Sequence, residues 1–373
     1  MTDQALLLKQ LIDTMEASGS LRTEPWKRAA AAVPRHEFLR DGFFRRVPGS
    51  AGAWAPVLGS GSEWLEACYT DESLVTQIAG TIAPADIRGQ IMRQPTSSST
   101  LPSLVLRMLE DLQVEDGMHV LEIGTGTGYS TAVLCSRLGE ENVTSVEYDE
   151  GVAAQAQAAL GRLGMWPALV TGDGLQGHGE GAPYDRVIAT CGVRTIPPQW
   201  IEQTRPGGLI LATVSGWLGT SELARLTVHE DGTASGRLLS GQVSFMLARP
   251  HLPPSLGLLP DLTAGKEREA IIGADALDDW TTRFIVQAAI PNAQRLTLNQ
   301  DGRDEHVLID VESGAWAALY EEDEDGEWTA RQGGPAALWD VAEEQLGRWH
   351  AAGSPALEEF TVKVTPKGQT YHW

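Results

Sequence analysis

The sequence predicts an α/β fold, with a Rossmann-like, mostly parallel sheet and helices on both of its faces. Strand-like and helical segments alternate from residue 117 to about residue 250, and such alternation favours a parallel sheet. A glycine-rich turn at residues 124–128 joins the first strand to a helix. Glu147 ends the next predicted strand and Asp173 follows the one after it, so they should gather with this turn at the sheet edge where ligands bind.

The chain has 373 residues, which is too many for one compact core, and we expect three regions. Residues 1–100 form an N-terminal region that begins with helices. Residues 101–250 form the Rossmann-like core, and residues 251–373 form a C-terminal α+β domain. The last boundary is placed at the proline-rich run Pro250-His251-Leu252-Pro253-Pro254.

Helices are predicted where apolar residues recur at helical spacing, and strands where short apolar runs are bounded by turn residues. The predicted helices are residues 6–15, 26–33, 104–112, 130–138, 151–163 and 336–349, the third capped by Ser99, Thr100 or Ser103. The predicted strands are residues 119–123, 143–147, 167–171, 185–190, 209–214, 295–298 and 306–311, followed by a hairpin around residues 366–368. Residues 49–62 are predicted to be a loop, 75–99 to hold few clear elements, 206–208 to be a turn and 321–325 to be an acidic loop.

The glycine turn indicates which kind of ligand would bind. Glycines at alternate positions let the backbone turn sharply and let a ligand lie against it. The third glycine of a dinucleotide fingerprint would fall on Tyr129, and the carboxylate of Glu122 would repel a pyrophosphate. A carboxylate suits a cationic ligand without phosphate, such as S-adenosylmethionine, and Glu147 is placed to accept hydrogen bonds from ribose hydroxyls. The alternatives are a turn that binds nothing and a Glu122 that is a buried structural carboxylate.

Composition argues against several other classes of protein. A formal net charge of -22 disfavours a nucleic-acid partner and adsorption to anionic membranes. The first residues lack the basic start of a signal peptide, and no apolar run reaches the length that spans a membrane. Three widely spaced cysteines lack metal-ligand spacing, so we expect no metal site and reduced thiols in a cytoplasmic protein.

Six motifs together resemble those of the protein-L-isoaspartate O-methyltransferase family. They are Val33-Pro34-Arg35-His36-Glu37-Phe38, Tyr69-Thr70-Asp71, residues 121–129, Gly172-Asp173-Gly174, Ala182-Pro183-Tyr184-Asp185 and Arg205-Pro206-Gly207-Gly208. The resemblance covers roughly the first two thirds of the chain. It implies a class I S-adenosylmethionine-dependent methyltransferase fold and a carboxyl O-methyltransferase activity on a peptide substrate.

The resemblance also implies roles for individual residues. The residues implied to contact the methyl donor are Glu122, Gly124, Thr125, Gly126, Gly128, Glu147, Gly172, Asp173, Gly174 and Leu175. The family's Ser-x-Pro motif, whose hydroxyl touches the substrate carboxylate, corresponds to Thr100-Leu101-Pro102. Thr100 and Asp71 are therefore the candidate catalytic residues, with a helix cap and a turn-forming aspartate as the respective alternatives. Arg93 and Arg194 could hold the other carboxylate oxygen, or be surface charges.

Two departures from the short family members suggest a more specific role. The stretch between Asp71 and Thr100 is longer than usual, and the region after Pro250 is an addition. This architecture resembles the branch that matures ribosomally made peptides, in graspetide (ATP-grasp ligase) or lanthipeptide pathways. It implies that an aspartate in a cross-linked peptide is esterified and closes to an aspartimide, with the C-terminal domain recognising the peptide. The alternatives are isoaspartyl repair of damaged proteins and a binding module without chemistry.

Overall fold

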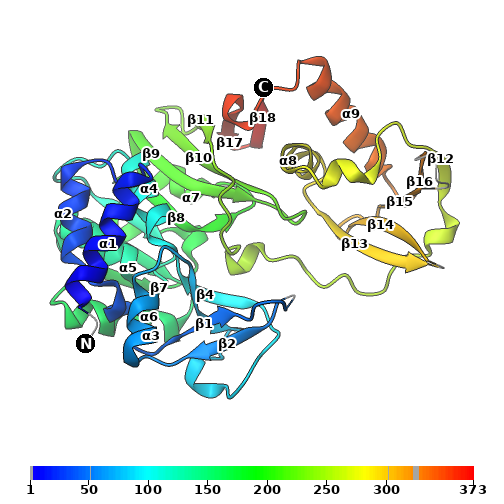
Figure 1. Ribbon diagram of the computed structural model, residues 1–373. Helices are drawn as coiled ribbons and strands as arrows, with labels where there is room; N and C mark the ends of the chain where they lie inside the picture. The colour runs from blue at the N-terminus through cyan, green and yellow to red at the C-terminus, as the bar shows by residue number, and fades with distance from the viewer. Residues whose placement is uncertain (1–2, 51, 301, 322–326) are drawn as a thin grey trace. The chain divides into compact units, whose positions relative to one another are not determined.

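The computed structural model describes residues 3–50, 52–300, 302–321 and 327–373 (Figure 1). Backbone contacts divide the chain into two compact units. The first consists of Met1–Thr190, Pro197–Leu211 and Thr227–Gly232, and the second of Cys191–Ile196, Ala212–Leu226 and Thr233–Trp373. Each unit is described separately below, and the three consecutive regions expected from the sequence remain a prediction.

Two amphipathic helices open the first unit, as predicted. Helix α1 (Gln4–Ala17) buries Leu11 and Met15, and helix α2 (Glu24–Ala32) buries Trp26. The turn between them is fixed by the carboxylate of Glu110, which accepts hydrogen bonds from the backbone N–H groups of residues 22 and 23 at 2.6 and 2.7 Å. Glu110 lies in helix α4 (Pro102–Asp111), so this carboxylate joins the N-terminal helices to the helix that follows Thr100.

A four-stranded sheet follows, and here the sequence-based prediction was wrong. Its strands are β1 (Phe43–Arg46), β2 (Trp54–Val57), β3 (Leu74–Ile78) and β4 (Pro95–Ser99), in the order β2-β1-β3-β4, with helix α3 (Gly61–Cys68) between β2 and β3. The predicted loop at 49–62 thus contains β2, and residues 75–99 contain most of two strands. Strand β4 reads Pro-Thr-Ser-Ser-Ser, which lacks apolar alternation. Its extended form comes from antiparallel pairing with β3 rather than from a hydrophobic pattern.

The long stretch between β3 and β4 packs against a hydrophobic cluster of the four-stranded sheet. Phe44, Trp54, Val75 and Ile78 form a buried cluster on the sheet, and Ile82, Ile87 and Ile91 of the connecting segment pack against it. Backbone hydrogen bonds of 2.9 Å join Trp54 and Ile91 in both directions. We call residues 79–94 the insertion, and these contacts make it a packed part of the first unit.

The central sheet of the first unit confirms the predicted parallel α/β core. Strands β5 (Val120–Ile123), β6 (Val143–Glu147), β7 (Ala168–Thr171) and β8 (Tyr184–Val193) pair in parallel in the order β8-β5-β6-β7, and β9 (Thr204–Ser215) follows next to β8. Helices α5 (Tyr129–Leu138), α6 (Glu150–Arg162) and α7 (Pro198–Gln203) alternate with the strands (Figure 1). Residues 206–208, predicted as a turn, are instead part of β9, which begins at Thr204, earlier than the apolar run that predicted it; residues 205–207 are exposed and Gly208 is buried.

The second unit contains the predicted α+β elements. Strands β10 (Ser221–Val228), β11 (Ala234–Leu239), β17 (Thr361–Thr365) and β18 (Gly368–His372) are neighbours, with the predicted hairpin at the end. A second sheet has the order β12-β16-β15-β14-β13, with bounds β12 (Lys266–Glu269), β13 (Ala293–Gln300), β14 (Arg303–Asp310), β15 (Trp316–Glu321) and β16 (Trp328–Gly333). Residues 322–325 of the predicted acidic loop lie outside the described residues.

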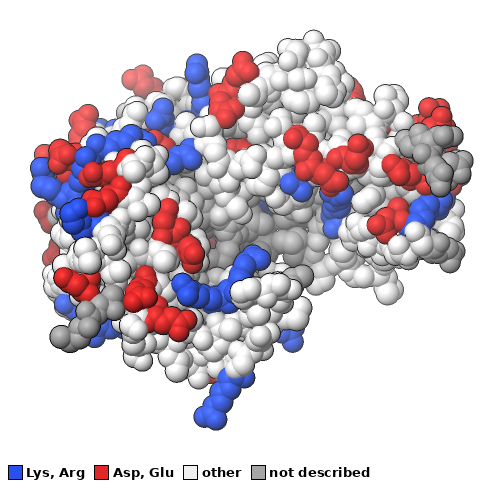
Figure 2. Space-filling view, in the orientation of Figure 1, with Lys and Arg blue, Asp and Glu red and all other residues white. Residues whose placement is uncertain are grey.

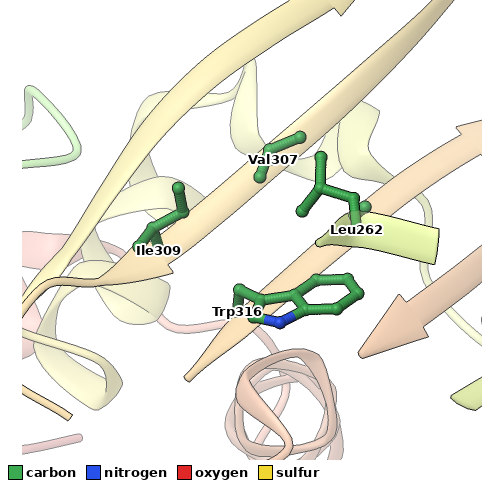
Figure 3. Close-up of a cluster of buried hydrophobic side chains, with 5 residues drawn as sticks. Leu262, Val307, Ile309 and Trp316 are labelled. Atoms are coloured by element: carbon green, nitrogen blue, oxygen red, sulfur yellow. The ribbon is translucent and has the colours of Figure 1, made fainter. Parts of the chain in front are cut away.

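One face of this five-stranded sheet packs against helices and the other against an irregular segment. Helix α9 (Leu338–Ala351) contacts β15 and β16, and α8 (Trp280–Ala289) packs on α9. On the opposite face, Leu262 meets Val307, Ile309 and Trp316 (Figure 3). The second unit therefore has its own hydrophobic core.

Candidate active site

The glycine turn between β5 and α5 is open to a ligand because its backbone adopts conformations that favour glycine. Gly124 and Gly128 have φ values of +94° and +88°. A Cβ on Gly124 would lie 2.8 Å from the hydroxyl of Thr190, which itself donates a hydrogen bond to the carbonyl of Ile123 at 3.2 Å. Thr190 of strand β8 thus contacts one side of the turn. The glycines place no side chain on the other side, where a ligand can approach.

Glu122 is engaged inside the protein rather than at the ligand side of the turn. Its side chain has no exposed surface, and it accepts hydrogen bonds from the hydroxyls of Ser130, Thr131 (2.5 Å) and Ser145 (2.7 Å). Burial raises the pKa of this carboxyl, against the opposing effect of the three hydroxyls. The geometry matches the alternative of a buried structural carboxylate, which joins β5, β6 and the start of α5.

Thr125 belongs to the same internal network. Its hydroxyl lies 2.6 Å from that of Ser145, and its side chain is buried. The backbone of Thr125 still forms part of the turn, and its N–H donates to the carbonyl of Val146 at 3.3 Å. A contact between Thr125 and a methyl donor would therefore involve the backbone.

Glu147, at the end of β6, faces the turn. One carboxylate oxygen accepts from the N–H of Gly126 at 2.9 Å, and the other from the N–H of Asp149 at 3.0 Å. Each oxygen keeps a further lone pair that a ribose hydroxyl could approach. Burial raises the pKa of Glu147, with the backbone donors opposing this effect.

The Gly-Asp-Gly loop lies next to Glu147. The N–H of Gly172 donates to the backbone carbonyl of Glu147 at 2.8 Å. Asp173 accepts from the N–H of Leu175 at 3.0 Å and so begins the short 3-10 helix η4 (Gly174–Gln176). The indole of Trp200 donates to the carbonyl of Gly174 at 2.8 Å and fixes the loop from beneath. The structure thus brings Gly124, Gly126, Glu147, Gly172 and Asp173 to one edge of the sheet.

Strand β4 and Thr100, which we call the acceptor segment, pass beside this edge. A Cβ on Gly126 would lie 3.4 Å from the carbonyl oxygen of Ser98, so β4 runs against the glycine turn. Thr100 follows directly, and among the described residues its hydroxyl takes part in no hydrogen bond. The predicted capping of the next helix by Ser99, Thr100 or Ser103 was wrong: the capping position is Leu101, without a side-chain cap.

Asp71 and Ser73 hold the start of α4 instead. The carboxylate of Asp71 accepts from the N–H of Ser103 at 2.9 Å, and the hydroxyl of Ser73 accepts from the N–H of Leu101 at 3.1 Å. These bonds satisfy N–H groups that a helix start leaves unpaired. Asp71 therefore has a defined structural contact beside Thr100, and its contact with substrate remains a prediction.

Arg35 is a site residue that the sequence-based reasoning did not assign. The side chain is fully buried, and its guanidinium donates to the carbonyls of five residues and to one hydroxyl. The acceptors are the carbonyls of Cys68 (3.3 Å), Thr70 (2.9 Å), Glu72 (2.8 Å), Ser99 (3.1 Å) and Thr100 (3.1 Å), and the hydroxyl of Ser99 (3.3 Å). The motif Val33–Phe38 was visible in the sequence, but its partners lie 33 to 65 positions further along.

The two arginines considered as carboxylate partners differ in the structure. Arg93 is exposed in the insertion. Arg194, in the second unit, lies 3.7 Å above the ring of Trp217 and donates to the carbonyl of Pro291 and the side chain of Asn292. Burial lowers the pKa of Arg194. Its guanidinium is thus already engaged within the second unit.

The arrangement fits S-adenosylmethionine. Glycines with positive φ leave the turn accessible, and Glu147 and Asp173 offer acceptors for hydroxyl and amine groups. This donor supplies an electrophilic methyl group on a sulfonium, and a carboxylate is already a nucleophile at neutral pH. The protein then needs to align and desolvate the acceptor, which the hydroxyl of Thr100 could help to do.

The fold and the site together define a class I S-adenosylmethionine-dependent methyltransferase. The family model described as "Protein-L-isoaspartate(D-aspartate) O-methyltransferase (PCMT)" matches residues 69–246. A protein-L-isoaspartate O-methyltransferase of Anaeromyxobacter dehalogenans is 44% identical over 157 residues, which are 42% of this chain and 73% of that protein. The chain belongs to the protein-L-isoaspartate O-methyltransferase family, whose members are carboxyl O-methyltransferases.

Two further similar proteins match different shares of the chain. A protein-L-isoaspartate O-methyltransferase of Thermotoga maritima is 37% identical over 137 residues, and this match spans 36% of the chain and 43% of the relative. A solved structure of a protein-L-isoaspartate O-methyltransferase superposes with a TM-score of 0.58, at 22% identity, and covers 98% of this chain and 99% of its own. The fold is thus shared along nearly the whole chain, including the part after residue 250.

Three further properties of the described residues concern metal sites, membrane-spanning helices and surface charge. They contain no group of three or more His, Cys, Asp or Glu side chains that could hold a metal ion. No described helix combines the length and apolar character of a membrane-spanning segment. On the face shown in Figure 2, acidic and basic side chains are interspersed.

Proposed function

We propose that the chain transfers a methyl group from S-adenosylmethionine to the side-chain carboxylate of an aspartate in a ribosomally made, cross-linked peptide. The observation that carries the methyl-transfer step is the position of Thr100. Its hydroxyl has no hydrogen bond to the described residues and follows a strand that touches the glycine turn. A hydroxyl at this place can donate to one carboxylate oxygen while the other oxygen attacks the methyl group.

The insertion forms part of a hollow beside the glycine turn, where the substrate carboxylate would bind. The hollow is lined by the loop after η1 (Arg35–Phe38), by helix α6 and by the insertion. Its lining includes Arg40, Pro84, Gly126, Thr127 and Arg162. A rigid, packed wall favours a preorganised substrate, because such a substrate loses less entropy on binding. We assign recognition of the rest of the peptide to residues 251–373.

The chemistry of the product follows from the ester. The carboxylate gains a methyl group and S-adenosylhomocysteine leaves. The backbone nitrogen of the next residue can then attack the ester carbonyl, losing its proton, while methanol departs. The aspartimide is lighter than the starting peptide by one water. The proposal includes a cytoplasmic location, which is compatible with three free cysteines.

A second candidate function is methylation of L-isoaspartyl residues in damaged proteins. The relatives in the comparisons carry that name, and the solved structure that covers 99% of its own chain has the C-terminal region too. Possession of that region therefore does not separate maturation from repair, contrary to what the sequence alone suggested.

Mass spectrometry with three substrates separates the two candidates. The full chain is incubated with donor and with a cross-linked peptide, its linear precursor or a short isoaspartyl peptide. Maturation predicts fast methylation of the cross-linked peptide and a product one water lighter. Equal rates on linear and cross-linked peptides, or efficient methylation of the isoaspartyl peptide, would favour repair. Thr100→Ala is the control that reports on background methylation.

A further inference from the structure

We propose that Arg35 is a positioning residue that sets the place of Thr100 for methyl transfer. This inference rests on the proposed function and deepens it. Arg35 joins two segments that are distant in the sequence, residues 68–72 and 99–100, through its guanidinium. The first segment carries Asp71 and the second carries Thr100.

The hydrogen bonds define the position of Thr100 from both sides. The carbonyl of Thr100 accepts from Arg35 at 3.1 Å, which leaves the side chain free. On the other side, the carboxylate of Asp71 binds the N–H of Ser103 and fixes the first turn of α4. Arg35 holds the residues on either side of Asp71 through the carbonyls of Thr70 and Glu72. A planar, five-donor group suits this task, and a lysine ammonium has only three donors.

Stability alone is a poor explanation for this arrangement. Arg35 is completely buried, and no ion pair within the described residues includes it. Burial of a cation is costly even when carbonyls surround it. Its other close neighbour is the ring of Tyr129, at 6.0 Å from the guanidinium carbon to the ring centre. Tyr129 begins helix α5 directly after the glycine turn, so Arg35 also lies against the donor side of the site.

The test is a double-mutant cycle between Arg35→Lys and Thr100→Ala, read out by kcat and by the donor Kd. Arg35→Lys should lower kcat about tenfold or more and leave the donor Kd within about twofold. In the Thr100→Ala background the same change should lower kcat less than about twofold, because the group that it positions is gone. Loss of the same factor in both backgrounds, or an increase in donor Kd as large as the fall in kcat, would overturn the inference.

Arg186 provides a matched control. It too is buried and donates to backbone carbonyls, those of Leu112, Gln113 and Asp185, away from the acceptor segment. Arg186→Lys should change the melting temperature but lower kcat equally in both backgrounds. If Arg35→Lys does not fold, Ser99→Ala removes one acceptor of Arg35 and should give a smaller, equally non-additive loss. Wild-type enzyme that methylates none of the three peptides would count against the proposed function, whereas additivity in active enzyme counts only against positioning.

Discussion

Replacement of Thr100 by alanine separates its catalytic role from a structural one. Among the described residues the hydroxyl has no hydrogen-bond partner, and Asp71 and Ser73 hold the start of α4. Thr100→Ala should therefore change the free energy of unfolding by no more than about 0.5 kcal/mol, as for substitutions that disturb no such feature. A helix cap would instead cost about 1 kcal/mol.

The effect on the reaction should be much larger. Loss of one well-aimed donor costs roughly 10²-fold or more in rate, or about 2.7 kcal/mol of the barrier. Thr100→Ser keeps the hydroxyl and should retain most of the activity, while Thr100→Val keeps the volume and should resemble alanine. Release of S-adenosylhomocysteine gives kcat, calorimetry gives the donor Kd, and thermal unfolding reports on folding. Wild-type turnover in Thr100→Ala would refute the reasoning, and so would a loss that only tracks a fall in stability.

Three further predictions concern the donor side. Glu147→Ala should weaken donor binding by about 1.5–3 kcal/mol in calorimetry, since bonds to a charged acceptor are lost; an unchanged Kd would place the donor elsewhere. The pKa of Glu147 is raised by burial, so its charge is lost as the pH falls through that raised value, above the ordinary range of a glutamate. Donor affinity should fall with it, and Glu147→Gln should remove this acid-range dependence. Glu122→Ala should leave three buried hydroxyls without their acceptor and lower the free energy of unfolding by about 1–3 kcal/mol, but retain donor affinity below its melting temperature. A large loss of donor affinity in the folded Glu122→Ala variant would instead indicate that Glu122 contacts the methyl donor.

The elements that sequence patterns predicted best are those with strong hydrophobic periodicity. Strands β5 and β6 were predicted from apolar runs and helix α6 from an alanine-rich run; β6 has the predicted bounds, and the bounds of β5 and α6 differ from prediction by at most one residue. Strand β4 was missed because Pro95–Ser99 is polar and becomes extended only through pairing with β3. Local patterns do not report on such long-range pairing.

The same distinction applies to the candidate site. Gly124, Glu147 and Asp173 could be placed near one another because parallel strand ends share an edge of the sheet. The inward direction of Glu122 could not be read from the sequence, since Ser130, Thr131 and Ser145 are ordinary hydroxyl residues until the fold brings them around it. For Arg35, the acceptors are backbone carbonyls, which any residue type supplies, so no side-chain pattern could identify them.

The two ends of the insertion are paired with each other across β3 and β4. This pairing has a consequence for how the substrate preference of the enzyme could be changed. Ile78 and Pro95 lie opposite each other across β3 and β4, and the N–H of Ala79 donates to the carbonyl of Gln94 at 2.9 Å. The segment between them therefore leaves and re-enters the sheet at neighbouring positions, which backbone pairing holds together. We expect that a change in its composition would remodel the wall beside the glycine turn, while the pairing of β3 with β4 would keep the register that carries Thr100. Exchange of residues 80–93, with the isoleucines that pack on the sheet retained, is thus a route to new peptide acceptors on an unchanged methyl-transfer site.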